Sequence, residues 1–483
     1  MASATRTIPT ELGTEQVGKL LKQYALPAIV AQIAASLYNM VDRIYIGHMN
    51  NDVFSGSDAI SGLAVTFPLM NLSTAFGTLV GAGAATMISI LLGQKHYHMG
   101  NKVLGNVVSL NIIIGFLFMG VTLAFLDPIL MFFGASEATL PYAKDYITII
   151  LYGNIITHLY FGLNAAMRAS GNPTKAMGLT IFTVILNAIL DPIFIFGFNM
   201  GIAGAAWATV ISQTTSMLIV LHHFNNRNRA IHFEKGIFRL NLNVAEKSLV
   251  IGTGPFLMNL AACAVTLLIN LQLRSCNSHD SAMADYYIAA FGICNSIVFM
   301  FIMICMGLNQ GMQPIAGYNY GAKLYSRVKD VFWKTAKLGM VTTTICFLIG
   351  MFIPRIACSI FTTDAALLDI AQRGMRCITL MFPIVGLQMI GTNFFQSLGL
   401  VKKSIILSLS RQLLMLIPLL YILPQMLDGV EIFGISLQAT DGVWLSFPIS
   451  DILSTILTVI LLRRLFRKFN HLTDGATAMS LDD

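Results

Sequence analysis

Residues 77–94 read GTLVGAGAATMISILLGQ, and residues 307–322 read GLNQGMQPIAGYNYGA. A shift of the sequence along itself by 228 positions places the second stretch on the first, with Gly83 on Gly311 and Gly93 on Gly321. The apolar stretches and the polar gaps between them stay in step along the rest of the chain. This shared pattern, more than the few identities, indicates that one membrane-embedded unit occurs twice.

The composition indicates a membrane protein. Charged residues make up 11% of the 483 residues, apolar residues 55%, and the mean hydropathy is +0.72. A soluble domain carries about a quarter charged residues, so this chain cannot cover a soluble surface, and the lipid bilayer is its expected partner. The net charge of +7 comes from basic residues in loops, which predicts membrane orientation and no nucleic-acid binding. The seven cysteines show no paired spacing and predict no metal site.

Twelve apolar stretches are long enough to cross a hydrocarbon core about 30 Å thick. They cover residues 22–47, 59–92, 103–126, 144–170, 176–197, 203–224, 248–273, 287–317, 331–353, 374–398, 404–424 and 442–462. The sequence therefore predicts an all-α membrane protein with twelve transmembrane helices in two pseudo-symmetric six-helix lobes. Six spans per lobe give both lobes the same orientation, so the pseudo-symmetry axis is expected to lie along the membrane normal.

The basic residues predict the orientation. About twenty of the thirty Lys and Arg residues fall in segments on the side of the N-terminus, which predicts that both termini are cytoplasmic. The one long segment on that side suggests the domain boundaries: an N-terminal lobe at 1–230, a cytoplasmic linker at 231–247 and a C-terminal lobe at 248–483. The substrate path is then expected between the lobes of a monomer.

Two aspartates lie within predicted spans of the first half. Asp42 occurs in LYNMVDRIYIG and Asp191 in LNAILDPIFIFG, both in the half of the bilayer far from the termini. Asn187 precedes Asp191 by one helical turn, and Thr209 lies at a similar depth in the next span. A charged Asp within the bilayer costs about 2.5–3.5 kcal/mol, so such groups usually face a bundle interior or a wet cavity. These four residues predict a cation-coupling cluster in the first lobe.

Tyr38, Tyr152 and Asn154 are candidates to surround this cluster. Two carboxylates in a low-dielectric pocket cannot both ionise cheaply, so one is expected to hold a proton near neutral pH. The same carboxylate, amide and hydroxyl oxygens would also suit sodium, a hard cation. Protons and sodium therefore both stay open as the coupling ion. A structural role, in which each aspartate only bonds a helix neighbour or a basic partner, stays open as well.

Three other features are candidates for a role in transport. Pro27 lies in the same span as Asp42, where its missing backbone hydrogen bond permits a bend; a static kink is the alternative. Met300 and Met303 are candidates to line a substrate path, because thioethers adapt to varied apolar cations; ordinary packing is the alternative. Asp451 lies in the middle of the last span and stays open between a structural hydrogen bond and a role in substrate charge.

The chain resembles the multidrug and toxic compound extrusion (MATE) family over most of its length, from about residue 20 to 465. The segments that carry the resemblance are LYNMVDRIYIGHM, GTLVGAGAATMISILLGQ, AMRASGNPTKAM, LNAILDPIFIFGFNMGIAGAAWATVISQ and GLNQGMQPIAGYNYGA. By motif position, Asp42, Asn187, Asp191 and Thr209 match the cation-coupling site of the DinF- and MepA-like bacterial members. Pro27 matches the proline at which the first helix of that family is proposed to bend. Spans 7 and 10 lack the carboxylates of NorM-like members, which favours coupling through the first lobe.

The resemblance implies a secondary active antiporter that exports drugs and organic cations in exchange for protons or sodium by alternating access. It implies a multi-pass monomer in a bacterial plasma (inner) membrane, with no cofactor besides the coupling ion. With sodium, the same four residues would be the metal ligands. The alternative is a lipid-linked precursor flippase of the same superfamily, which would need more basic residues within the spans than this chain has. No ATP-binding P-loop and no HExxH, paired CxxC or GxSxG motif occurs, so no enzyme is predicted.

Overall fold

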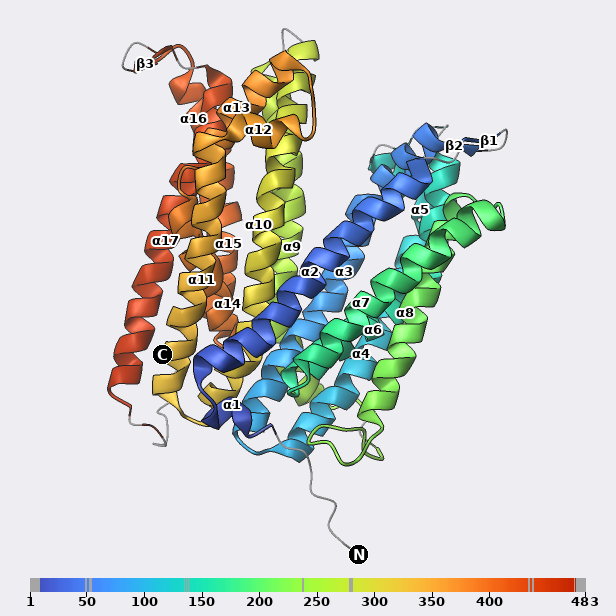
Figure 1. Ribbon diagram of the computed structural model, residues 1–483, viewed down its shortest axis with the longest axis vertical. Helices are drawn as coiled ribbons and strands as arrows, with labels where there is room; N and C mark the ends of the chain where they lie inside the picture. The colour runs from blue at the N-terminus through green and yellow to red at the C-terminus, as the bar shows by residue number, and fades with distance from the viewer. Residues whose placement is uncertain are drawn as a thin grey trace, which may run out of the picture. The chain divides into compact units, whose positions relative to one another are not determined.

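The protein is almost entirely helical (Figure 1). The computed structural model describes residues 9–47, 50–51, 54–133, 135, 137, 139–236, 239–277, 281–432, 435–436, 438–472 and 474; the side chains of 37–62, 64, 281–282 and 431–437 lie outside this description. Helices α1 (Glu11–Thr14), α2 (Val17–Gly47), α3 (Gly56–Gly93), α4 (Tyr97–Ala124), α5 (Leu126–Phe132), α6 (Leu140–Ala169), α7 (Pro173–Pro192) and α8 (Ile202–Phe224) form the first half. The π-helical segment η1 (Ile193–Gly197) follows α7.

The second half has a similar order of helices. It contains α9 (Leu242–Cys276), α10 (Ser281–Gly321), α11 (Tyr325–Phe352), α12 (Pro354–Ser359), α13 (Ala365–Thr379), α14 (Phe382–Ser397), α15 (Val401–Leu409), the π-helical segment η2 (Ser410–Leu416), α16 (Ile417–Leu427) and α17 (Ala439–Asn470). Two short antiparallel pairs, β1 (Asn50–Asn51) with β2 (Phe54–Ser55) and β3 (Glu431–Ile432) with β4 (Ile435–Ser436), close helix connections.

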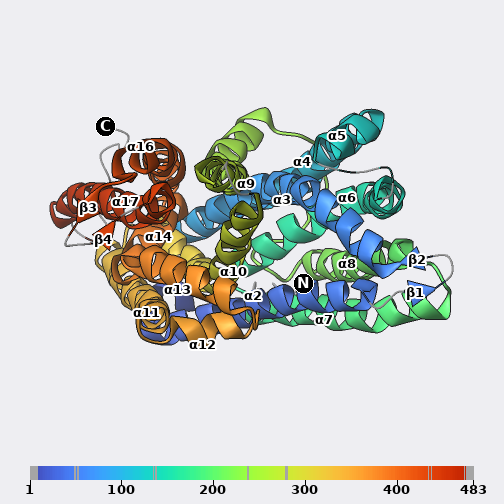
Figure 2. The same ribbon diagram turned by 90° about the horizontal axis from the view of Figure 1, so that it is seen from above.

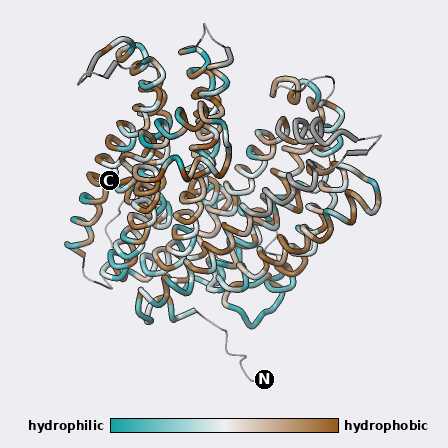
Figure 3. The backbone as a smooth tube through the Cα atoms, turned by 45° about the horizontal axis from the view of Figure 1, so that its top comes forward, coloured by the Kyte–Doolittle hydropathy of each residue, from teal (hydrophilic) through white to brown (hydrophobic). Residues whose placement is uncertain are grey.

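Each predicted span falls on one of these helices or on two or three consecutive helical segments. Ten helices of the described part are long and apolar enough to cross a membrane, and α13 with α14, bent by 55°, makes an eleventh. The 31-residue α2 is a further long helix, whose side chains are described only as far as residue 36. Apolar colour runs along the helices, and polar colour gathers at their ends and in the loops (Figure 3). The break between α13 and α14 was not expected from the sequence.

The chain divides into two compact units. The first unit contains Met1–Phe256 and Gln313–Ala322, and the second contains Leu257–Met312 and Lys323–Asp483. The first unit thus includes the start of α9 and the end of α10, which the predicted boundaries assign to the C-terminal lobe. The predicted lobe boundaries stay a prediction. Two helix crossings explain why the start of α9 and the end of α10 belong to the first unit.

Glycines allow these helix backbones to touch. A Cβ atom on Gly93 of α3 would overlap the carbonyl oxygen of Tyr318, and one on Gly321 of α10 would overlap that of Ile90. The shift of 228 positions converts 90 and 93 into 318 and 321, so this crossing maps onto itself. The start of α9 crosses α3 as closely, because a Cβ on Gly252 would overlap a carbonyl oxygen of α3. These contacts join the start of α9 and the end of α10 to the first unit.

The linker also belongs to the first unit, because asparagines of α4 hold its backbone. Asn106 donates from Nδ2 to the carbonyl of Asn241 (3.0 Å) and accepts from the Asn241 N–H (3.2 Å). Asn101 accepts from the N–H of His232 (3.0 Å) and donates to the Glu234 carboxylate. Burial raises the pKa of Glu234, but the hydrogen bonds from Asn101 and His98 outweigh it and leave this pKa below its ordinary value.

Each unit has its own apolar core. In the first unit, α6 packs against α3, α4 and α8, and the core is built on Tyr146, Ile147 and Leu151 of α6 (Figure 2). In the second unit, α14 packs against α11 and α17, and the core surrounds the buried indole of Trp444. Since α6 is a central helix, its polar residues must bond within the bundle.

Candidate functional site

Three of the predicted cluster residues lie together on α7 and α8. The Asn187 side-chain nitrogen lies 3.4 Å from Asp191 Oδ1 and 3.4 Å from Thr209 Oγ1. The exposed fractions are 2% for Asn187, 0% for Asp191 and 8% for Thr209, so the cluster is enclosed. A carboxylate, an amide and a hydroxyl thus share one buried place within the first unit.

The local sequence explains this arrangement. Asn187 and Asp191 are four residues apart on α7 and therefore share one helical face. Pro192 follows directly, has no N–H to donate, and ends α7 at the start of η1. Gly204 of α8 lies against the Phe194 backbone of η1, where a Cβ atom would come within 2.8 Å of the Phe194 carbonyl carbon. This close approach brings the start of α8, and with it Thr209, next to the end of α7.

The oxygens of the cluster are suited to a proton or a hard cation. The Asn187 side-chain oxygen is buried and has no hydrogen-bond partner among the described residues. The Thr209 hydroxyl donates to the Ala205 carbonyl (3.1 Å), so its lone pairs stay directed into the cluster. Together with the Asp191 carboxylate, these are oxygen ligands, which suit sodium rather than a soft metal. Within the described part of the chain, no group of three His, Cys, Asp or Glu side chains gathers into a metal site.

The side chains of Asp42 and Tyr38 lie outside the described residues, so their place in the cluster stays a prediction. The backbone at both positions belongs to α2. Helix α2 packs along α7, and the two helices run side by side in both views (Figures 1 and 2). The helix that carries position 42 is therefore a direct neighbour of the helix that carries Asp191. Pro27 lies inside α2, which continues through it as one helix.

Tyr152 and Asn154 do not join this cluster by any described contact. The Tyr152 side chain is 62% exposed on α6. Asn154 is 1% exposed and accepts a hydrogen bond from the Ser73 hydroxyl of α3. His158, one turn further along α6 and fully buried, bonds the Ser73 hydroxyl (3.1 Å) and carbonyl (2.9 Å) through Nε2. Asn154 thus belongs to a network between α3 and α6.

The histidine of this network is a residue that sequence reasoning missed. His158 lies in the middle of a predicted span, and an ionisable residue in such a place is itself a signal. A second polar link that was missed joins α7 to α8, where the Thr183 hydroxyl lies 2.6 Å from the Ser216 hydroxyl. The Thr183–Ser216 contact holds together the two helices that carry the Asn187 cluster.

Asp451 of the second unit has a cationic partner. Arg411 Nε donates to Asp451 Oδ1 at 2.7 Å, and the carboxylate is 2% exposed. Arg411 lies in η2, and its carbonyl accepts a hydrogen bond from Ser450 Oγ (2.7 Å). The structural role considered for Asp451 therefore has a partner in the fold, which is Arg411. Met300 is 57% exposed and Met303 is half-buried on α10, and nothing in the described contacts links them to a substrate path.

Comparison with known proteins places the chain in a family. The MatE family profile matches residues 27–193 and 261–422, which together make up more than half of the chain. The chain belongs to the MatE family. The Multidrug export protein MepA of Staphylococcus haemolyticus (strain JCSC1435) is 28% identical over 409 residues, which is 84% of this chain and 86% of that protein. MepA of Staphylococcus aureus (strain bovine RF122 / ET3-1) is 27% identical over 95% of this chain and 97% of its own length.

Solved structures agree with this family. The MATE multidrug transporter DinF-BH, solved in complex with R6G, is 34% identical, with a TM-score of 0.83 over 95% of this chain and 98% of that one. A MATE protein in the bent conformation has a TM-score of 0.87 at 19% identity, over 97% and 99% of the two chains. The predicted MATE family and its twelve-helix, two-lobe fold are therefore confirmed. So is the prediction of a membrane transporter for multidrug efflux rather than an enzyme, as the family relatives are transporters.

Proposed function

We propose that this MatE protein is a secondary active antiporter, which exports organic cations and drugs in exchange for protons or sodium by alternating access. The observation that carries the proposal is the fully buried Asp191 carboxylate, in hydrogen-bond contact with Asn187 beside Thr209. A buried carboxylate can bind a proton, or with the two neutral oxygens a sodium ion, and lose it again when water gains access. The similarity to MepA and DinF-BH supports drugs as the substrate class.

The proposed membrane is a bacterial plasma membrane, with the protein as a multi-pass monomer and both termini in the cytoplasm. Asp42 is proposed as the second carboxylate of the cluster, and Pro27 as a place where α2 bends when the cluster takes up its cation. Cation and substrate must favour opposite states of the transporter, because only differential affinity shifts a conformational equilibrium.

The energy of one proton is sufficient for useful export. A charge that moves through a potential of about 100 mV gains about 2.3 kcal/mol. A pH difference of one unit adds about 1.4 kcal/mol. Together they maintain a gradient of a few hundredfold for a neutral substrate. A single titrating site is therefore enough for the mechanism.

The test is transport by the purified full chain in liposomes. Ethidium movement is followed first under an imposed pH gradient and then under a sodium gradient. Asp191→Asn and Asp42→Asn are compared with Asp127→Asn, which removes an exposed carboxylate paired with Lys144 at 2.8 Å. We expect Asp191→Asn and Asp42→Asn to abolish gradient-driven transport and Asp127→Asn to retain it.

A further variant separates the two coupling ions. Thr209→Val removes one hydroxyl oxygen of the cluster and keeps its volume. With sodium coupling, it should raise the sodium concentration needed for half-maximal transport, whereas with proton coupling it should leave the pH dependence close to that of the parent. Loss of coupling in Asp127→Asn as well, or full coupling in Asp191→Asn, would contradict the assignment of the site.

A further inference from the structure

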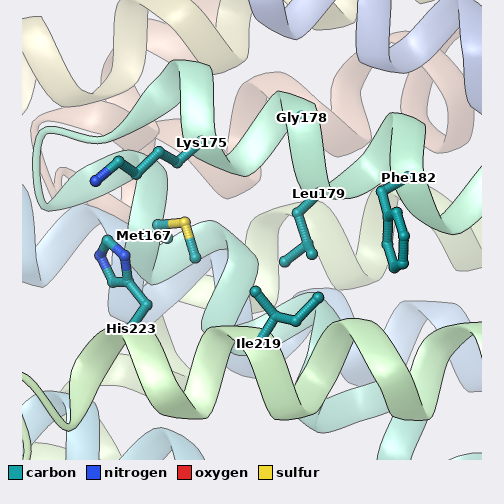
Figure 4. A pocket seen from close by; sticks show the side chains of 7 residues that line it. All are labelled: Met167, Lys175, Gly178, Leu179, Phe182, Ile219 and His223. Carbon is teal, nitrogen blue, oxygen red and sulfur yellow. The ribbon is translucent and has the colours of Figure 1, made fainter.

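A pocket of about 330 Å³ lies between α7 and α8, away from the Asn187 cluster. Its apolar wall is formed by Leu179 and Phe182 of α7 and by Ile219 of α8 (Figure 4). Phe182 and Ile219 are 40% and 45% exposed, so the wall is open to the surroundings of the protein. In a membrane protein, such an open apolar groove faces lipid.

A lysine and a histidine side chain occupy one end of the same pocket. Lys175 of α7 and His223 of α8 lie near each other at that end, with the apolar residues beyond them (Figure 4). Arg229, just after α8, and Lys175 both lie close enough to repel a positive charge on His223, so Lys175 and Arg229 are the cations at this end of the groove. Within the described part of the chain, neither Lys175 nor Arg229 forms an ion pair. The Arg229 guanidinium donates from one terminal nitrogen to Asn172 Oδ1 (3.3 Å), and its Nε atom is buried without a hydrogen-bond partner. The positive charge here is therefore not neutralised by a described acidic residue.

The order of groups along the groove corresponds to an amphiphile. Phe182 lies seven residues after Lys175, which is about 10 Å along a helix. Lys175 is close to the start of α7 and His223 to the end of α8, the same end of the unit at which the linker leaves α8. The charges are thus at the boundary of the membrane, and the apolar wall extends from them toward its interior.

We infer that this groove binds an anionic phospholipid, with its phosphate at Lys175 and His223, in the field of the neighbouring Arg229, and an acyl chain against Phe182 and Ile219. Basic pockets between transmembrane helices are known to hold anionic head groups in this way. The assignment to the cytoplasmic leaflet rests on the proposed orientation, but the binding itself does not depend on transport. The bound lipid would contact both helices that carry the Asn187 cluster, although its site is separate from that cluster.

Native mass spectrometry of the full chain in detergent tests the charge. Phosphatidylglycerol and phosphatidylcholine with identical acyl chains are added in turn, and inorganic phosphate is added as a competitor in a third arm. We expect preferential retention of phosphatidylglycerol, with an affinity about fivefold lower in Lys175→Gln, since one surface cation contributes about that factor. Lys247→Gln, an exposed lysine of α9 outside the groove, is the matched control and should bind as the parent does.

A steric variant tests the groove independently of charge. Gly178 lines the pocket, and a Cβ atom there would meet nothing within 4 Å, so Gly178→Leu fills the groove without a backbone clash. Gly120→Leu places the same side chain in open space on α4 and is its control. We expect only Gly178→Leu to lose the lipid. Equal retention of the two lipids, equal effects of the groove and control variants, or displacement by inorganic phosphate would overturn the inference, whether or not the protein transports ethidium.

Discussion

Replacement of Asp451 by asparagine removes the carboxylate that neutralises the Arg411 guanidinium in the second unit. The two side chains are 2% and 22% exposed and are joined at 2.7 Å. Loss of one member of a buried ion pair costs about 3–5 kcal/mol, because the remaining charge stays buried. Arg411 retains some access to its surroundings, so we expect a value near the lower end, about 3 kcal/mol, for Asp451→Asn.

A double-mutant cycle separates the interaction energy of the Arg411–Asp451 pair from the cost of burying its two charges. Arg411→Met with Asp451→Leu replaces both charges by apolar side chains, which is often close to neutral for a buried pair. We therefore expect the double variant to be more stable than the summed effects of Arg411→Met and Asp451→Leu predict, with a coupling energy of about 2–3 kcal/mol. Unfolding by SDS in mixed micelles, followed by the helical circular dichroism signal, measures each free energy.

An exposed ion pair in the same unit is the control. Arg355 and Asp369 are joined at 3.0 Å, but their side chains are 58% and 68% exposed. Asp369→Asn should change the free energy of unfolding by at most about 1 kcal/mol, as is usual for exposed pairs. If Asp451→Asn cost no more than Asp369→Asn, or if the double variant were as unstable as the sum of its single variants, the pair would not hold η2 against α17.

Four further substitutions give expected outcomes that unfolding measurements can check. Gly252→Ala places a methyl group on the backbone of α3 and should destabilise the first unit, whereas Gly120→Ala, with open space around it, should leave the unfolding midpoint unchanged or raised. The pKa of Glu234 is lower in the folded state than in the unfolded state. Its contribution to stability is therefore complete above the unfolded pKa and is lost as pH falls through the folded pKa. Glu234→Gln should remove this part of the acid dependence of stability. Ser73→Ala leaves the buried Asn154 oxygen without its donor and should cost about 1–3 kcal/mol.

The sequence predicts those parts of the site that depend on local spacing. Asn187 and Asp191 share a face because they are four residues apart in a continuous helix, and Thr209 follows from the depth of the next span. The apolar lengths predict the helices for the same reason, since each span is a local property of the chain. Tyr152 fails this reasoning: depth in the membrane does not determine the direction of a side chain around the helix, and its ring is 62% exposed.

The remaining features depend on contacts between residues far apart in sequence. Ser73 and Asn154 are separated by 81 positions and Arg411 and Asp451 by 40, so no periodic pattern links them. The π-helical segment η2 could not be predicted either, because no sequence pattern marks a change in the helical hydrogen-bond register. A single sequence thus predicts which residues share one face of a helix more readily than which residues of another helix they contact.

The last helices of the two halves differ at one polar position. Gly204 of α8 and Gly442 of α17 make the same close approach to the backbone of the preceding helical segment, so these two glycines occupy equivalent places. Nine residues after Gly204 stands Gln213, which bonds the Thr157 hydroxyl; nine residues after Gly442 stands Asp451.

An amide in the first half is therefore replaced by one member of an ion pair in the second. The guanidinium of Arg411 neutralises Asp451, so protonation of that carboxylate would leave a buried cation behind. Asp191 of the first half accepts a hydrogen bond from the amide of Asn187, and the proposed coupling puts a proton or a sodium ion at this carboxylate. Both halves thus contain a buried aspartate, and the one in the second half has an arginine partner that opposes its protonation.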